Sequence, residues 1–186
     1  MHSEFAMTDL GLLRQFLGLE IEQNERGIKM SQPQYDPDLI KNFNMVECKA
    51  SKSPFLSGIK MHEFGNSPLV DITLYRKLVG SLLYLTRTRP DLSYAVSAVA
   101  RNMHQPHKIH WRAEKIIHQY IQGTNNFGVH YTASSSLQLA GFFDSDWDGD
   151  PIDRKSNSGF VFMFDEGPIL WSIKKQHTIS LSSAEA

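Results

Sequence analysis

The sequence predicts an α+β fold, with helices in the middle of the chain and strands on both sides of them. After Asp71, leucines repeat at the spacing of one helix face, whereas from Phe127 onward short apolar runs alternate with turn-forming residues. A chain of 186 residues has room for one domain or two small ones. We divide it into segments 1–70, 71–133 and 137–186.

The first segment is predicted to begin with two strands, over residues 12–22 and 27–31, joined by a turn-forming stretch. Residues 33–44 carry apolar side chains at helical spacing and are predicted to form a short helix. Prolines and glycines interrupt residues 45–70 without periodicity, which indicates a long connection.

Three helices are predicted in the middle segment. The first begins at Asp71 and ends before Pro90, because proline disfavours helical geometry in the residue before it. Asp91 is expected to cap the second helix, and the third runs from Pro106 to Gly123. Strands are then predicted at 127–132, 137–144, 158–164, 169–174 and 178–182.

The net charge of −1 conceals an uneven distribution: residues 1–71 carry −3, residues 72–136 carry +6 and residues 137–186 carry −4. A basic middle beside an acidic end is typical of a phosphate-facing segment next to a metal-binding one, although helical surfaces also vary in charge without function. The single cysteine, Cys48, excludes an internal disulfide and a zinc site built from cysteines.

No apolar run is long enough to span a bilayer, and the first residues do not resemble a signal peptide. We therefore expect a cytoplasmic or nuclear protein without a membrane partner.

An acidic cluster follows the apolar run that ends at residue 143. Its members are Asp144, Asp146, Asp148, Asp150 and Asp153. Hydrolysis of a phosphodiester by two metal ions needs oxygen ligands that are rigidly held, and the end of a buried strand holds a carboxylate most rigidly. Asp144 is therefore the preferred metal ligand and Asp146 the next. An acidic, solvated surface turn is the alternative.

Residues 139–151, 154–160, 171–176 and 182–186 resemble the start of the ribonuclease H domain in the Pol polyprotein of copia-type LTR retrotransposons. The resemblance implies a truncated ribonuclease H-like mixed sheet, with Asp144 as the first catalytic carboxylate and Mg²⁺ or Mn²⁺ as the cofactor of the parent enzyme. The second carboxylate is expected beyond Ala186, and Glu185 is expected on another side of the helix. The catalytic site is accordingly expected to be incomplete, without tightly bound metal.

Residues 7–11, 16–21 and 27–32 resemble the hairpin that follows the polymerase active site in the same family and leads into the thumb. Residues 75–85, 88–91 and 110–131 resemble the thumb and connection. The resemblance implies that the basic side chains of this region contact the duplex backbone. They are Arg76, Lys77, Arg87, Arg89 and Arg101, and for each one an ordinary exposed base is the alternative.

Three functions follow from these patterns. The chain is predicted to be a fragment of a retrotransposon Pol polyprotein, catalytically incomplete alone, whose partners are nucleic acid and the rest of the polyprotein. One alternative is a non-catalytic module that holds an RNA–DNA hybrid or a DNA duplex. The other is a ribonuclease H that becomes active on pairing with another chain.

Overall fold

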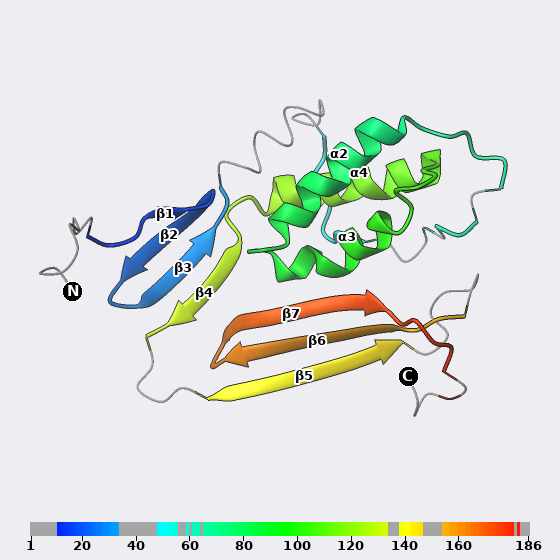
Figure 1. Cartoon of the computed structure of the whole chain (residues 1–186). Helices are drawn as coiled ribbons and strands as arrows, with labels where there is room; N and C mark the ends of the chain where they lie inside the picture. Colours follow the sequence, from blue (N-terminus) through cyan, green and yellow to red (C-terminus); the bar gives the residue numbers. More distant parts are fainter. Residues whose placement is uncertain are drawn as a thin grey trace, which may run out of the picture.

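The computed structural model describes residues 11–33, 48–55, 59, 61–63, 65–133, 138–146, 154–180 and 182. The helix predicted over residues 33–44 lies almost wholly outside these residues. Figure 1 shows two sheets and a group of helices that lies beside the first sheet and above the second, which is the predicted α+β class.

The first sheet combines the N-terminal hairpin with a strand from the end of the helical segment. Its order is β1 (Gln15–Phe16), β2 (Leu19–Asn24), β3 (Gly27–Ser31) and β4 (Gly128–Thr132), and all neighbours are antiparallel. The strand predicted over 12–22 is divided by a turn at Leu17 and Gly18, whose φ angles are 48° and 78°. Because β4 pairs with β3, this sheet crosses the boundary predicted at residue 70.

Gly27 allows β4 to approach β3 closely. Its φ angle is 140°, and a Cβ atom there would lie 1.9 Å from the carbonyl oxygen of Tyr131. Only glycine combines this backbone conformation with the absence of a side chain. The residue therefore fixes how the helical segment closes back onto the hairpin.

The helical layer contains α2 (Ile72–Leu85), the 3₁₀ turn η1 (Pro90–Leu92), α3 (Ser93–Ala100) and α4 (Lys108–Gly123). Asp71 caps α2 as predicted, because its Oδ1 accepts a hydrogen bond from the backbone N–H of Leu74 at 2.9 Å. The expectation that Asp91 caps the next helix is wrong. Asp91 lies inside η1, and its carboxylate pairs with Arg89 instead.

The apolar core lies between these helices. Its buried members are Tyr75, Val79, Leu82, Leu85, Leu92, Ala95, Val96, Val99, Ala113, Ile117 and Ile121. The hydroxyl of Tyr75 is satisfied inside this core by donating to the carbonyl oxygen of Val99 at 2.9 Å. Among the described residues, no helix has the length and hydropathy required to cross a membrane.

The second sheet has the order β5 (Leu139–Asp146), β6 (Asn157–Phe164) and β7 (Gly167–Lys175). All its described pairings are antiparallel, whereas the sequence predicted a mixed sheet. The strand predicted over 178–182 is also absent from the described part of that range. There, Gln176 donates to the hydroxyl of Ser158 at 2.7 Å and accepts from Ser180 at 3.1 Å, so side-chain hydrogen bonds replace a strand ladder.

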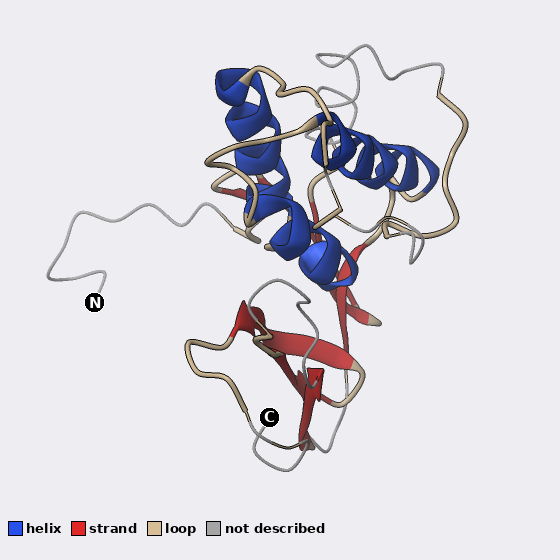
Figure 2. Cartoon of the chain, turned by 90° about the vertical axis from the view of Figure 1, so that its right-hand side faces the viewer, coloured by secondary structure: helices blue, strands red, loops and turns tan. Residues whose placement is uncertain are grey.

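Two of the hydrogen bonds that attach the second sheet to the rest of the molecule involve β7. The indole N–H of Trp171 donates to the carbonyl oxygen of Thr86 at 3.2 Å, and the hydroxyl of Tyr131 donates to that of Pro168 at 2.7 Å. One face of the sheet lies under α3 in Figure 1, and Figure 2 shows the helices above this sheet from another side. The opposite face is not covered by any described helix or strand.

Candidate nucleic-acid interface

Asp144 and Asp146 lie at the end of β5, on the face of the sheet that is turned toward the helices. Asp144 is opposite Gly159 of β6, and Asp146 is opposite Asn157. Alternation along a strand places both carboxylates on the same side as Trp171 and away from Phe143. The structure thus brings the two predicted metal ligands to one face, but their surroundings differ.

The carboxylate of Asp146 is engaged by a side chain that sequence reasoning missed. One oxygen accepts the backbone N–H of Asn157, and the other accepts its side-chain N–H at 2.8 Å. Asn157 is 8% exposed, and its side-chain Oδ1 accepts a hydrogen bond from Nη1 of Arg101 at 2.8 Å. Asp146, Asn157 and Arg101 therefore form a relay from β5 through β6 to the end of α3.

Asp144 is exposed. The described residues contain no group of three histidine, cysteine, aspartate or glutamate side chains able to hold a metal ion. Because Asn157 holds the carboxylate of Asp146, Asp144 offers a single carboxylate ligand, whereas two divalent ions need several carboxylate ligands. The described residues consequently do not fit a two-metal centre; Asp148, Asp150, Asp153 and Glu185 lie outside them.

A cleft of ≈ 830 Å³ separates β7 from α2 and α3. We call it the basic cleft, because the charged or titratable side chains among its described lining residues are Arg87, Arg101, Lys174, Lys175 and His177, and none of these described residues is acidic. Arg87 is exposed and follows the end of α2, whereas Arg101 is half-buried at the end of α3. Positive side chains along an open cleft attract an anionic backbone.

A second, smaller cleft of ≈ 360 Å³ adjoins Asp144. We call it the aromatic pocket; its walls include Phe142, Phe160, Trp171, Val161 and Ile173, and Asp144 is the one charged residue in the described part of its lining. Ser93, Trp171 and Ile173 line both this pocket and the basic cleft, so the two are neighbours.

Arg76 and Lys77 lie on the exposed surface of α2, outside the lining of the basic cleft. Nε of Arg76 donates to the carbonyl oxygen of Met103, just beyond α3, at 3.0 Å. That bond holds the Arg76 side chain against the same end of α3 at which Arg101 lies.

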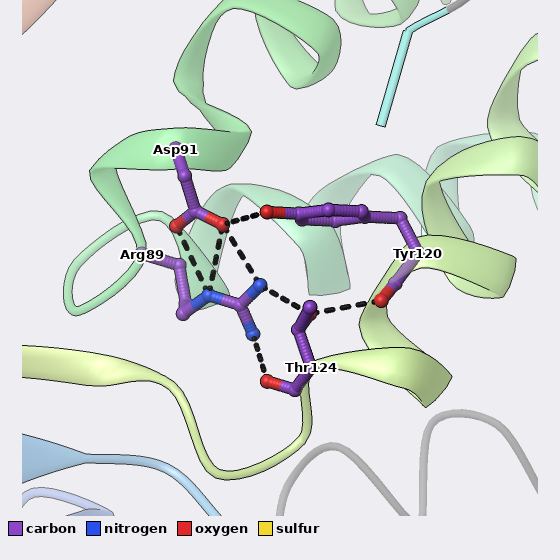
Figure 3. A network of polar contacts seen from close by, with 4 residues as sticks. All are labelled: Arg89, Asp91, Tyr120 and Thr124. Carbon is purple, nitrogen blue, oxygen red and sulfur yellow. Dashed lines mark hydrogen bonds and ion pairs between the residues drawn. The ribbon is translucent and has the colours of Figure 1, made fainter. Parts of the chain in front are cut away.

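Arg89 has a different environment from the other four basic residues. Its side chain is 1% exposed, and Nε and Nη2 donate to the two oxygens of Asp91 at 3.0 and 2.9 Å (Figure 3). Nη1 donates to the carbonyl oxygen of Thr124 at 3.0 Å, at the end of α4. These bonds occupy the guanidinium inside the fold, so the expectation that Arg89 contacts a nucleic-acid backbone is not supported by its position.

Tyr120 completes this network by donating its hydroxyl proton to Asp91 at 3.0 Å. Burial raises the pKa of Tyr120, and the neighbouring charge of Asp91 raises it further, so the hydroxyl remains a donor at neutral pH. The Arg89 guanidinium also lies 5.7 Å from the centre of the Tyr120 ring, within reach of a cation–π interaction.

Residues 1–57 match a family model described as reverse transcriptase (RNA-dependent DNA polymerase), a family that generally uses divalent metal ions. Over its full length, the chain is 38% identical to the retrovirus-related Pol polyprotein from transposon RE1 of Arabidopsis thaliana, of which it covers 13%. It is 35% identical to the Pol polyprotein from transposon TNT 1-94 of Nicotiana tabacum over 198 aligned residues and covers 15% of it.

A shorter relative extends this comparison. The chain is 36% identical over its full length to an uncharacterized mitochondrial protein of Arabidopsis thaliana, of which it covers 77%. No solved structure matches the chain. The chain thus spans about an eighth of the Pol polyproteins that it matches. Because the likeness extends over all 186 residues, the chain belongs to the family of copia-type retrotransposon Pol polyproteins and corresponds to a fragment of one.

Proposed function

We propose that this chain is a nucleic-acid-holding segment of a retrotransposon Pol polyprotein, in which the basic cleft contacts the sugar–phosphate backbone of an RNA–DNA hybrid or a DNA duplex. The observation that supports this best is the cleft of ≈ 830 Å³ between β7 and the helices, whose described lining contains Arg87, Arg101 and Lys175 and no acidic side chain. Phosphate contacts of this kind position a duplex without reading its sequence.

The proposal includes an assignment of the parts. Segments 1–70 and 71–133 act as the thumb and connection of a reverse transcriptase, and segment 137–186 acts as the first part of a ribonuclease H-like domain. The antiparallel order β5-β6-β7, with Asp144 near the end of its first strand, supports the second assignment. The rest of the Pol polyprotein is the natural partner of such a segment.

Fluorescence anisotropy of a labelled RNA–DNA hybrid, titrated with the chain at low and moderate salt, tests the proposal. We expect affinity to fall steeply with salt, because each neutralised phosphate releases bound counterions. Binding that does not depend on salt, or no binding at either salt concentration, would contradict it.

The location of the interface is tested by substitution. Arg87→Ala removes an exposed cation of the basic cleft, and the slope of log affinity against log salt should become shallower by about 0.9 for each phosphate that is no longer neutralised. Arg112→Ala is the matched control, because Arg112 is an exposed arginine on α4 outside the cleft lining. Equal slopes for both variants would place the interface elsewhere.

Hydrolysis of the hybrid is the second candidate function, and exposed Asp144 at the end of β5 is the observation that favours it. Since the described residues do not fit a two-metal centre, we propose that the chain alone leaves a labelled hybrid intact in Mg²⁺ or Mn²⁺. Cleavage that disappears in Asp144→Asn would overturn this. A ribonuclease H assembled from two chains would instead show activity per molecule that rises with protein concentration.

A further inference from the structure

The basic cleft and the aromatic pocket adjoin each other but offer opposite chemistry. The basic cleft presents Arg87, Arg101 and Lys175, whereas Asp144 is the one charged residue among those the structure describes in the aromatic pocket. Figure 1 shows α3 lying over β7, which is the strand that contributes to both. A ligand that spans them must carry negative charge at one end and an apolar body with a hydrogen-bond donor at the other.

The aromatic pocket suits a planar ring. Phe142 is 57% exposed on its wall, and the indole of Trp171 is held in place by its bond to the carbonyl oxygen of Thr86. Gly159, which pairs with Asp144 on the neighbouring strand β6, also lines the pocket and has no side chain. A volume of ≈ 360 Å³ falls in the range of sites for small ligands. Stacking between an aromatic side chain and a base tolerates every base, because each one has a π-face.

Asp144 determines which edge of the ring the pocket prefers. An ionised carboxylate accepts hydrogen bonds and donates none, so it favours amino groups and ring N–H groups over carbonyl oxygens. Asp144 is exposed at the pocket, whereas the neighbouring Asp146 is occupied by Asn157. The preferred ring is accordingly a nucleobase that bears an amino group.

The basic cleft supplies the position for the phosphate. Arg87 is exposed, and the bond from Arg101 to Asn157 at 2.8 Å fixes the direction of its guanidinium. An arginine carries five N–H donors, so one such bond leaves others to meet phosphate oxygens. The two clefts share a wall formed by Ser93, Trp171 and Ile173. The position for the phosphate and the position for the base therefore lie on the two sides of this wall.

We propose that the two clefts together bind one unpaired nucleotide of a nucleic-acid strand, with its amino-bearing base in the aromatic pocket beside Asp144 and its phosphate in the basic cleft. The inference rests on the proposed function, because it assumes that this face meets nucleic acid. It goes further by naming an unpaired nucleotide, since a base that is stacked in a duplex cannot enter a pocket.

The first test is a titration with two mononucleotides that differ by a single amino group, GMP and IMP, followed by tryptophan fluorescence. EDTA keeps divalent ions away from Asp144. Replacing Trp111 and Trp147 by Phe leaves Trp171 as the only reporter. We expect both nucleotides to quench Trp171, and GMP to bind roughly fivefold or more tightly than IMP, because an extra bond to a carboxylate is worth about that factor.

Three variants test which side chains of the aromatic pocket bind the nucleotide. Phe142→Ala should weaken both nucleotides roughly tenfold by removing a stacking partner. Asp144→Ala should remove the difference between GMP and IMP while both still bind. Phe16→Ala is the matched control, because Phe16 is 54% exposed on β1, outside the lining of both clefts, and its replacement should change neither affinity. A thermal melt of each variant confirms that it is folded.

The outcomes separate this inference from the proposed function. If the same preparation binds the labelled RNA–DNA hybrid in a salt-sensitive way while neither nucleotide quenches Trp171, the inference is overturned and the proposed function stands. If neither hybrid nor nucleotide binds, both fail. Equal affinity for GMP and IMP would overturn the role of Asp144.

The source of the nucleotide is tested with a single-stranded oligonucleotide that ends in guanine. We expect it to quench Trp171 and to compete with GMP for the same site. If free GMP quenches Trp171 but the oligonucleotide neither quenches it nor competes with GMP, the proposal that the ligand is part of a strand is wrong.

Discussion

Arg89 shows how its neighbours decide what a single basic residue does. It directly precedes η1 and forms a bidentate ion pair with Asp91 inside that turn. It also donates to Thr124 through two nitrogens, at 3.0 and 2.7 Å, and so joins the start of α3 to the end of α4. Removing a buried charge from such a network leaves several acceptors without a donor.

We expect Arg89→Ala to lower the free energy of unfolding by about 2–4 kcal/mol, because the change breaks a buried ion pair whose partner is partly hydrated. Urea denaturation followed by circular dichroism measures this decrease. Arg89→Lys should recover only part of it, since an ammonium group cannot form the same fork of hydrogen bonds.

Arg87→Ala is the matched control for stability. Arg87 is exposed two residues earlier in the chain, so its replacement should change the unfolding free energy by less than about 0.5 kcal/mol. If Arg89→Ala were as stable as Arg87→Ala, the structural role assigned to Arg89 would be wrong.

At the scale of elements, the first turn of α4 depends on two histidines. Nδ1 of His110 accepts the backbone N–H of His107 at 3.0 Å, and its Nε2 donates to the carbonyl oxygen of Met61 at 2.9 Å. His107 in turn bonds the carbonyl oxygen of Ser67 at 2.6 Å. The two side chains therefore cap the helix and attach the preceding connection to it.

This arrangement predicts acid sensitivity. Burial lowers the pKa of His110 below its ordinary value of 6.5, because the neutral ring is favoured inside the fold. The neutral ring is also the form that accepts at Nδ1. A group whose pKa is lowered by folding contributes stability above its unfolded pKa, and that contribution disappears as the pH falls. The unfolding free energy should thus decrease from about pH 6.5 downward.

Denaturant titrations at several pH values between about 8 and 5 measure the effect. His110→Gln keeps hydrogen-bonding groups but removes the titration, so its stability should depend less on pH across this window. His177→Gln is the control, because His177 is exposed beyond β7 and its replacement should leave the pH dependence unchanged. Parallel curves for the wild type and His110→Gln would refute the prediction.

At the scale of the whole molecule, the second sheet presents an apolar face away from the helices. Phe143, Leu139 and Leu170 on that face are 71%, 63% and 54% exposed. The ring of Phe143 lies 5.5 Å from that of Phe162, which joins the exposed side chains into one surface. Among the described strands, β5 pairs on one side only, so an open edge borders this surface. Apolar faces and open edges of this kind promote association.

We expect Phe143→Lys to reduce self-association of the chain, because a charge on an exposed strand opposes pairing with another molecule. Sedimentation velocity over a range of protein concentrations measures it. Leu12→Lys is the control, since Leu12 is 70% exposed outside the second sheet. If both variants reduced association equally, net charge and not this face would be the cause.

The sequence by itself determined the elements whose signal is local. Leucine spacing and Asp71 located α2, and turn residues located the hairpins, because helix caps and turns depend on neighbouring residues. The ordered likeness to Pol polyproteins also follows from sequence alone. Asp144 was correctly predicted to lie on a strand, because an apolar run before a carboxylate is a local pattern, but β5 continues to Asp146, two residues beyond the predicted end.

Tertiary structure decided how those elements use their polar side chains. Asn157 binds Asp146 and Arg101 across eleven and 56 residues, and Arg89 bonds Thr124 across 35, so no local pattern could reveal either interaction. A long separation along the sequence also explains why the sequence did not predict that β4 joins the sheet of β3. Whether a basic residue faces solvent or an internal partner depends on which distant segments pack beside it, and packing exists only once the chain has folded.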